Sequence, residues 1–268
     1  MSTGLIKLSS PATKQFWEIP VLYEDDHLLA LDKPSQLPVS PDRYQPQGPS
    51  LIKLLHRDIA RGAPWSASRQ IKYLANAHRL DSETTGVLLL AKDKTSLVAL
   101  ADQFGIESPA QTYIALIHRT PPEHVFHVNA KLARHPSKPG VICVDEKQGR
   151  RAITNFEVLE RFVGYTLLKC QPLSSRTHQI RVHLQHVAHP IVGDSLYGGG
   201  RLLLSTLKPN YRLKPNRTER PLLDRVALHA ESLRIIHPFS KSALSITAAW
   251  PKDLTVAVKY LRRFAPEL

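Results

Sequence analysis

The sequence predicts an α+β fold built on a mainly antiparallel or mixed β-sheet flanked by helices. First, strand-like and helix-like segments follow one another without the steady strand–helix–strand alternation of a parallel sheet. Second, 42% of the 268 residues are hydrophobic and 22% are charged, which is typical of a globular protein with a sizeable core. We expect a flexible arm over residues 1–15 and a single domain over residues 16–268.

The first half of the chain is predicted to hold a hairpin, two helices and two further strands. Leu51, Leu54, Leu55 and Ile59 fall on one face at helical spacing, and Ser50 precedes them as a capping residue. In order, the expected elements are a hairpin (21–34), a loop (35–49), a helix (50–62) ending at Gly62, a strand (86–92), a helix (93–105) between Asp93 as cap and Gly105, and a strand (113–118).

The second half is predicted to add a long hairpin, a helix, two strands and a last helix. The apolar run over 155–173 is expected to turn at Val163-Gly164, since glycine allows a tight turn. The remaining elements are a helix (177–189) capped by Thr177, strands (231–236 and 243–249) and a helix from residue 254 capped by Asp253.

The charge of the chain indicates a polyanionic partner. Lys and Arg number 36 against 23 Asp and Glu, which gives a formal net charge of +13 and a pI near 9.9. Residues 201–225 carry seven of these basic residues against Glu219 and Asp224, and their prolines favour a surface loop. Nucleic acid is the leading candidate partner, and a basic globular protein without such a partner is the alternative.

The sequence also argues against several classes of protein. No stretch approaches the roughly 18 apolar residues that span a bilayer, and the N-terminus lacks the pattern of a secretory signal. Cys143 and Cys170 lie in apolar contexts without metal-ligand spacing, which favours reduced thiols in a cytoplasmic protein. The sequence has no glycine-rich nucleotide-binding motif and no serine elbow.

Two segments combine ionisable side chains with rigid flanks. HRLDSETTGVLLLAKD (78–93) places Asp81 in a turn before an apolar strand. SSRTHQIRVHLQHVAHPIVGDSLYGGG (174–200) clusters Arg176, His178 and Arg181 at the start of the expected helix. Both segments are therefore candidates for chemistry.

A metal site is considered because His183, His186 and His189 recur at a spacing of three. Zinc sites more often use an i, i+4 pair with an acid or a distant third ligand, and the sequence has no HExxH motif. We therefore expect no metal, and we expect these histidines to contact phosphate, cap helix ends or fill polar edges.

Five motifs follow one another along most of the chain. They are LDKPSQLPVSP (31–41), HRLDSETTGVLLLAKD (78–93), TYIALIHR (112–119), SRTHQIRVHLQHVAHPIVGDSLYG (175–198), and LHAESLRIIHPFS (228–240) with AAWPKDL (248–254). In this order they resemble the motifs of the pseudouridine synthases, specifically the RluA branch, which acts on ribosomal and transfer RNA. The departures are small: Ser175 replaces a common Gly, Leu-Asp-Lys-Pro replaces Asn-Lys-Pro, and Gln111 stands where a basic residue often precedes the tyrosine.

The resemblance implies a pseudouridine synthase-like catalytic domain that isomerises specific uridines in ribosomal or transfer RNA. It places the catalytic carboxylate at Asp81 and the tyrosine that stacks on the target uracil at Tyr113. It places the cation that keeps the carboxylate ionised at Arg181, with Arg176 as the alternative. The reaction involves no redox change and no net hydrolysis, so no cofactor and no metal are expected.

The resemblance also implies that the target base is flipped out of folded RNA, at a cost of a few kcal/mol. Contacts with phosphates, expected from residues 131–151 and 201–225, offset part of this cost. We expect the enzyme to be a cytoplasmic monomer that needs no protein partner and no membrane. The residues expected to bind RNA are Lys33, His78, Arg79, Arg176 and His178, and for His78 a structural hydrogen bond is the alternative.

Two other functions are weighed against this interpretation. A basic RNA-binding protein without catalysis fits the composition, but it does not explain an acid such as Asp81 at a surface facing RNA. A glycosidase needs two matched carboxylates, and Glu83, the nearest second acid, is expected to face solvent. Which RNA and which uridine are modified is not encoded in the motifs.

Overall fold

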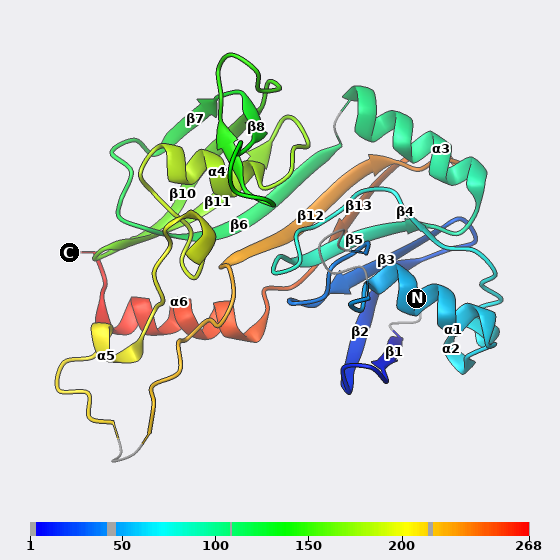
Figure 1. Ribbon diagram of the computed structural model, residues 1–268, viewed down its shortest axis with the longest axis horizontal. Helices are drawn as coiled ribbons and strands as arrows, with labels where there is room; N and C mark the ends of the chain where they lie inside the picture. The colour runs from blue at the N-terminus through cyan, green and yellow to red at the C-terminus, as the bar shows by residue number, and fades with distance from the viewer. Residues whose placement is uncertain (1–3, 42–46, 108, 214–216, 268) are drawn as a thin grey trace. The chain divides into compact units, whose positions relative to one another are not determined.

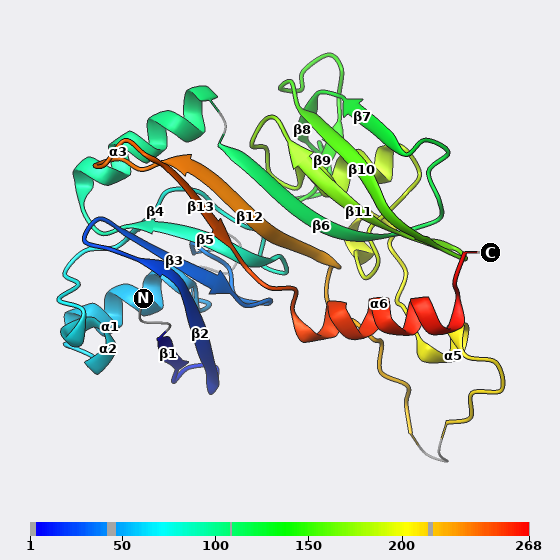
Figure 2. The same cartoon turned by 180° about the vertical axis from the view of Figure 1, so that it is seen from behind.

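The computed structural model describes residues 4–41, 47–107, 109–213 and 217–267. The chain forms two compact units, shown in Figures 1 and 2: unit 1 comprises residues 1–111 and 230–249, and unit 2 comprises residues 112–229 and 250–268. Within the described ranges, no helix is long and apolar enough to cross a membrane. Part of the expected loop over 35–49, namely residues 42–46, lies outside them.

Unit 1 is built on one sheet in which the strand order is β1-β2-β3-β5-β12, with β4 paired to β5 and β13 to β12. Every pair of its strands with a described register is antiparallel. Its elements are β1 (Leu5–Ser10), β2 (Gln15–Glu24), β3 (Leu28–Lys33), α1 (Leu51–Ala60), α2 (Pro64–Ser68), β4 (Ala75–Asn76), β5 (Thr85–Ala91), α3 (Lys94–Asp102), the π-helical turn η1 (Gln103–Glu107), most of β12 (Leu228–Ile236), and β13 (Ala243–Thr247).

The expected hairpin, first helix and apolar strand of unit 1 are confirmed. β2 and β3 form the hairpin, and α1 begins after Ser50, whose hydroxyl accepts a hydrogen bond from the Lys53 amide at 3.4 Å. All seven residues of β5 are buried. At Gly86 the backbone has a φ of +110°, and a Cβ there would overlap the carbonyl group of Ala230 on β12. Only glycine allows this close approach.

The first residues of the chain differ from the expectation of a flexible arm. Residues Leu5–Ser10 form β1, which pairs with β2, and the Ile6 and Leu8 side chains are buried. The alternation of apolar and polar residues in LIKLSS, which puts every second side chain into the core, is the physical reason.

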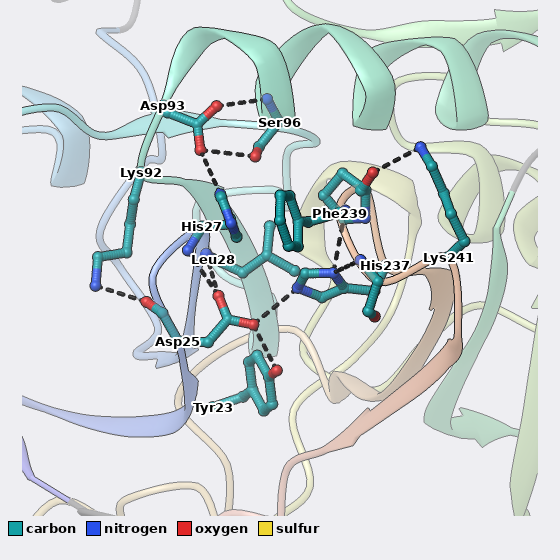
Figure 3. A network of polar contacts seen from close by, with 12 residues as sticks. Tyr23, Asp25, His27, Leu28, Lys92, Asp93, Ser96, His237, Phe239 and Lys241 are labelled. Atoms are coloured by element: carbon teal, nitrogen blue, oxygen red, sulfur yellow. Dashed lines mark hydrogen bonds and ion pairs between the residues drawn. The ribbon is translucent and has the colours of Figure 1, made fainter.

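A polar network joins three distant segments of unit 1 (Figure 3). The Asp25 carboxylate accepts hydrogen bonds from the amides of His27 and Leu28 at 2.8 and 2.7 Å, from the Tyr23 hydroxyl at 2.6 Å, and from His237 Nε2 at 2.8 Å. Burial raises the pKa of Asp25, but these hydrogen bonds together hold the pKa below its ordinary value. Asp25 therefore ties the β2–β3 turn to the turn after β12.

The same network reaches the start of α3. Asp93 caps this helix by accepting the Ser96 amide at 2.7 Å, and its other carboxylate oxygen lies 3.0 Å from His27 Nδ1 (Figure 3). The expected cap is confirmed, whereas the expected stop at Gly105 is wrong because the chain continues as η1. The His27 ring in turn stacks on the exposed Phe239 ring at 4.6 Å.

Unit 2 is built on four antiparallel strands in the order β6-β11-β10-β7, with a separate two-stranded sheet of β8 and β9. The predicted hairpin over 155–173 is confirmed as β10 and β11, with Gly164 in its turn at a φ of +79°. The elements are β6 (Ala110–His118), β7 (Val125–Asn129), β8 (Leu132–Arg134), β9 (Ile142–Val144), β10 (Ile153–Phe162), β11 (Tyr165–Pro172), α4 (Gln179–His186), η2 (Ser195–Tyr197), α5 (Leu204–Leu207) and α6 (Lys252–Phe264).

Two helix starts in unit 2 differ from the expected caps. α4 starts after His178 rather than Thr177, and His178 has the left-handed backbone conformation (φ 55°, ψ 18°) with no capping side chain. α6 starts after Pro251, so Asp253 lies in its first turn and pairs with Arg225. The α+β class with a mostly antiparallel sheet and flanking helices is confirmed, while the single domain over 16–268 stays a prediction.

Candidate active site

The turn that carries Asp81 lies directly before β5 in unit 1. The Thr84 amide donates to the Asp81 carbonyl at 3.2 Å, and the Thr84 side chain is buried. Asp81 itself is half-buried, and its neighbour Leu80 is buried. The fully buried strand β5 thus provides a rigid base for a carboxylate that keeps partial access to solvent.

Lys33 fastens this turn to the loop after β3. Its side chain is fully buried, and its ammonium group donates to the carbonyls of Pro34 (2.7 Å), Leu37 (2.9 Å) and Ser82 (2.9 Å). A buried ammonium group needs such partners, because burial without them costs several kcal/mol. The expectation that Lys33 contacts RNA is therefore corrected: the structure gives it a structural role beside the Asp81 turn.

His78 holds the other end of the motif against β5. Its Nε2 accepts the Leu89 amide at 3.0 Å, its carbonyl accepts the Asn76 side-chain amide at 3.0 Å, and its ring stacks on Phe104 at 5.0 Å. Burial lowers the pKa of the imidazole to about 4, so the ring is neutral near pH 7. A buried, neutral ring is no phosphate ligand, so this RNA-binding expectation is corrected in favour of the structural hydrogen bond.

Arg79 is exposed to solvent, although its neighbours His78 and Leu80 are buried. Of the three residues, Arg79 is the one that the structure leaves accessible to RNA. Its role as an RNA contact stays a prediction.

Tyr113 lies on β6 in unit 2, opposite Cys170 of β11. The tyrosine is 8% exposed, and the neighbouring residues Ile114 to Ile117 are buried. Burial raises the pKa of the Cys170 thiol above its ordinary value, so the sulfur stays protonated and unreactive. The strand therefore fixes the position of Tyr113 while leaving little of its surface open.

Arg181 is held by an acid that the sequence motifs did not single out. Its Nε and Nη2 donate to the two carboxylate oxygens of Asp194 at 2.6 and 2.8 Å, and both side chains are buried. The guanidinium carbon also lies 5.0 Å from the centre of the Tyr197 ring. This bidentate pair fixes the orientation of Arg181 within unit 2. The predicted pairing of Arg181 with Asp81 stays a prediction.

His178 belongs to the same cluster. Its Nδ1 lies 2.7 Å from the Tyr197 hydroxyl, which also accepts the Ile142 amide of β9 at 3.0 Å. The direction of the bond between His178 and Tyr197 depends on which ring nitrogen of the histidine carries the proton. The exposed Arg176 side chain donates to the Arg151 carbonyl at 3.4 Å and remains accessible to RNA.

Asp194 and Tyr197 are the residues that sequence reasoning missed. A signal for Asp194 was present, because it is the sole acidic residue between Glu160 and Glu219. Its loop is also tightly built: at Gly193 (φ +79°) a Cβ would overlap the carbonyl of Arg225. The glycines of this segment therefore place a carboxylate beside α4.

The histidines of α4 do not form a metal centre in the described part of the chain. No group of three or more His, Cys, Asp or Glu residues there could hold a metal ion. The Nδ1 atom of His183 lies 2.9 Å from the Thr154 hydroxyl, and burial lowers the pKa of His183 to about 4. It therefore serves as a neutral core histidine.

The chain matches the family model described as RNA pseudouridylate synthase over residues 27–186. The chain belongs to this family. Its members isomerise uridine in RNA, so the protein is an RNA pseudouridine synthase. The matched region includes the Asp81 turn, Tyr113 and Arg181.

Curated relatives cover most of the synthase. Ribosomal large subunit pseudouridine synthase D of Xylella fastidiosa is 34% identical over 260 residues, which cover 95% of this chain and 73% of the relative. The protein of the same name from Salmonella typhimurium is 31% identical over 254 residues (91% and 71%). An uncharacterized RNA pseudouridine synthase of Synechocystis sp. is 33% identical over 251 residues (92% and 70%).

Solved structures show the same fold. The human RNA pseudouridylate synthase domain containing 4 matches with a TM-score of 0.66 and 23% identity over 90% of this synthase and 92% of that chain. The human RNA pseudouridylate synthase domain containing 1 matches with a TM-score of 0.64 and 22% identity over 89% and 87%.

Proposed function

We propose that the enzyme isomerises uridine in ribosomal RNA of the large subunit, with Asp81 as the catalytic carboxylate. The observation that carries this proposal is the half-buried Asp81 in a turn fixed by buried Lys33 and His78, at the position where the family motif has its aspartate. The names of the curated relatives favour ribosomal RNA over transfer RNA.

The chemistry needs only groups that the chain supplies. The bond between C1′ of the ribose and N1 of uracil breaks, the uracil turns, and C1′ bonds to C5. C5 then loses its proton to solvent and N1 gains one, so atoms balance without a cofactor. Asp81 attacks the ribose or the ring, or removes a ribose proton, and each route requires its ionised form.

Three further residues have distinct parts in the proposal. Tyr113 stacks on the target uracil and assists loss of the C5 proton. Arg181, oriented by Asp194, favours the ionised form of the reacting carboxylate. Exposed Arg79 holds the space that the flipped nucleotide leaves.

The test measures tritium release from large-subunit ribosomal RNA and from transfer RNA transcripts labelled at C5 of uracil. Asp81→Asn should lower the rate by at least about 1,000-fold while RNA binding stays near that of the wild type. Glu83→Gln is the matched control, because it neutralises the other acid of the same turn and should keep the wild-type rate. Tritium release by Asp81→Asn at the rate of the control would refute the assignment of Asp81. Release from transfer RNA alone would show that transfer RNA, and not ribosomal RNA, is the substrate.

The proposal also includes a cytoplasmic enzyme that acts as a monomer. Both cysteines are free, and Cys170 is buried, which agrees with a reducing compartment. Light scattering of the purified enzyme, alone and with RNA, tests the monomer. A stable dimer in both samples would overturn it.

A further inference from the structure

The positive charge of the chain is concentrated in unit 2. Unit 1 carries 14 Lys and Arg against 13 Asp and Glu, a net charge of +1, whereas unit 2 carries 22 against 10, a net charge of +12. Nearly all of the electrostatic attraction to a polyanion therefore comes from unit 2.

One part of this charge lies around α5 and α6. Figures 1 and 2 both place α5 beside α6, and the two helices are in contact. We define the α5–α6 surface as the exposed basic side chains of α6 and of the described residues on either side of α5 that form no ion pair within the described part of the chain. They are Arg201, Lys208, Arg212, Arg217, Arg220, Lys252, Lys259 and Arg263. Arg262 of α6 is excluded because it binds Glu160.

Few acids oppose these cations. Asp253 is bound by the buried Arg225 at 2.7 and 2.9 Å, and Glu219 accepts the Ser205 amide at 2.8 Å. The exposed acids are Asp224 and Glu267. The surface therefore keeps a strong positive excess after its internal pairs are formed.

Two ion pairs hold α6 in place beneath the surface. Arg225 binds Asp253 in the first turn of α6, and Arg262 binds Glu160 of β10 at 2.7 Å near the last turn. Between these pairs, α6 buries Leu254 and Leu261. The cations of α6 therefore stand on a fixed backbone, which reduces the conformational entropy lost when they meet phosphates.

A second basic region lies elsewhere on unit 2. Figures 1 and 2 both show β8 near the top of the unit and α5 and α6 at the bottom, and Figure 2 shows β9 next to β8. The β8–β9 region carries the exposed Arg134, Lys138 and Lys147, and the exposed Arg176 donates to the carbonyl of Arg151, which follows β9 in the chain. The two regions are therefore separate, and one short RNA loop does not account for both.

The aromatic side chains of the α5–α6 surface favour a double-stranded ligand. Single-stranded RNA is bound by exposed rings on which bases stack. Here Tyr260 and Phe264 are half-buried and stack on each other at 6.0 Å, and the Arg263 guanidinium carbon lies 5.2 Å from the Phe264 ring. The surface therefore offers cations that bind backbone phosphates rather than exposed rings on which bases stack.

We propose that the α5–α6 surface binds the phosphate backbone of an RNA helix that flanks the target uridine. The inference rests on the proposed function, and it adds a second contact that selects RNAs in which a helix adjoins the target. Recognition follows backbone geometry and is independent of base sequence.

The experiment compares two triple variants of the full chain. Lys208→Gln, Arg220→Gln and Lys259→Gln together remove three cations of the α5–α6 surface, and Lys53→Gln, Lys72→Gln and Lys94→Gln together remove three exposed cations of unit 1. All six side chains are exposed, so both variants should fold. The probe is a fluorescent RNA hairpin with a stem of about 16 base pairs, a length that one double-stranded-RNA-binding domain covers.

The α5–α6 variant should bind the hairpin about 10- to 100-fold more weakly at 0.15 M salt. The slope of log K against the logarithm of the salt concentration should become less negative by about 2 to 3. In tritium release from labelled large-subunit RNA, KM should rise by a similar factor while kcat changes less than two-fold. The unit 1 variant should match the wild type in each measurement.

Equal slopes for the two variants would overturn the inference. So would an α5–α6 variant that loses affinity for heparin or acidic vesicles and keeps its affinity for the hairpin. A wild-type enzyme that releases no tritium from any RNA would instead overturn the proposed function, and the hairpin measurement would still decide the binding surface.

Discussion

Acidification from pH 7 to pH 5 should destabilise the protein through His78. Burial places the pKa of the folded-state imidazole at about 4, below its ordinary value of 6.5, so the unfolded chain binds more protons between these values. The stability contributed by neutral His78 is fully present above about pH 6.5 and is lost as the pH falls through this window. With these two pKa values, one histidine costs about 2 kcal/mol between pH 7 and pH 5.

His183 should contribute a similar loss, because burial lowers its pKa to about 4 as well. The wild type should therefore lose about 4 kcal/mol of unfolding free energy from these two sites. The lowered pKa values of Asp25 and Asp93 start from 3.8, so their titration lies below this pH window.

The assay is urea unfolding followed by circular dichroism at pH 7 and pH 5. His78→Gln keeps an acceptor for the Leu89 amide but has no titrating group, so its loss between the two pH values should be about 2 kcal/mol smaller than that of the wild type. His183→Asn tests the other site in the same way. An unchanged loss in His78→Gln would refute the argument that the ring is buried in its neutral form.

Three substitutions test other features of the fold. Lys33→Met should lower the unfolding free energy by at least about 3 kcal/mol, because three carbonyls lose their donor, and a shift of the urea midpoint measures this. Asp194→Asn should cost about 3 to 5 kcal/mol, because it replaces the buried carboxylate that binds the Arg181 guanidinium with a neutral amide; an unchanged melting temperature would contradict this. Gly86→Ala should cost more than about 3 kcal/mol through overlap with the Ala230 carbonyl, and soluble expression at a wild-type melting temperature would disprove the close approach.

Much of the fold could be predicted because its signals are local. The alternation of β2 and β3, the apolar run of β5 and the stripe of α1 all depend on neighbouring residues. The starts of α1 and α3 followed from their capping residues, but those of α4 and α6 did not. Thr177 is a good capping residue by type, but α4 begins after the left-handed His178, whose ring is occupied by Tyr197.

The candidate site, too, could be predicted only where its signals come from neighbouring residues. The sequence could show that Asp81 sits in a turn before a buried strand, since both features are adjacent. It could not show that Lys33 is buried, because its three carbonyl partners come from two loops that are far apart in the chain. Nor could it show the bond between Arg181 and Asp194, which depends on how the loop after α4 folds back.

The order in which the ribosome makes the chain gives unit 1 an unusual folding problem. Its sheet needs β12 beside β5, and Asp25 needs His237, a partner 212 residues later. At ordinary rates of protein synthesis, the 138 residues from 112 to 249 take roughly 7 to 28 s to make. During that time most of the edge of β5 that pairs with β12 in the folded chain has no partner, because β4 covers only Leu90 and Ala91, and such an edge favours aggregation. Unit 1, which holds the Asp81 turn, is therefore started first and completed only after most of unit 2 has been synthesised.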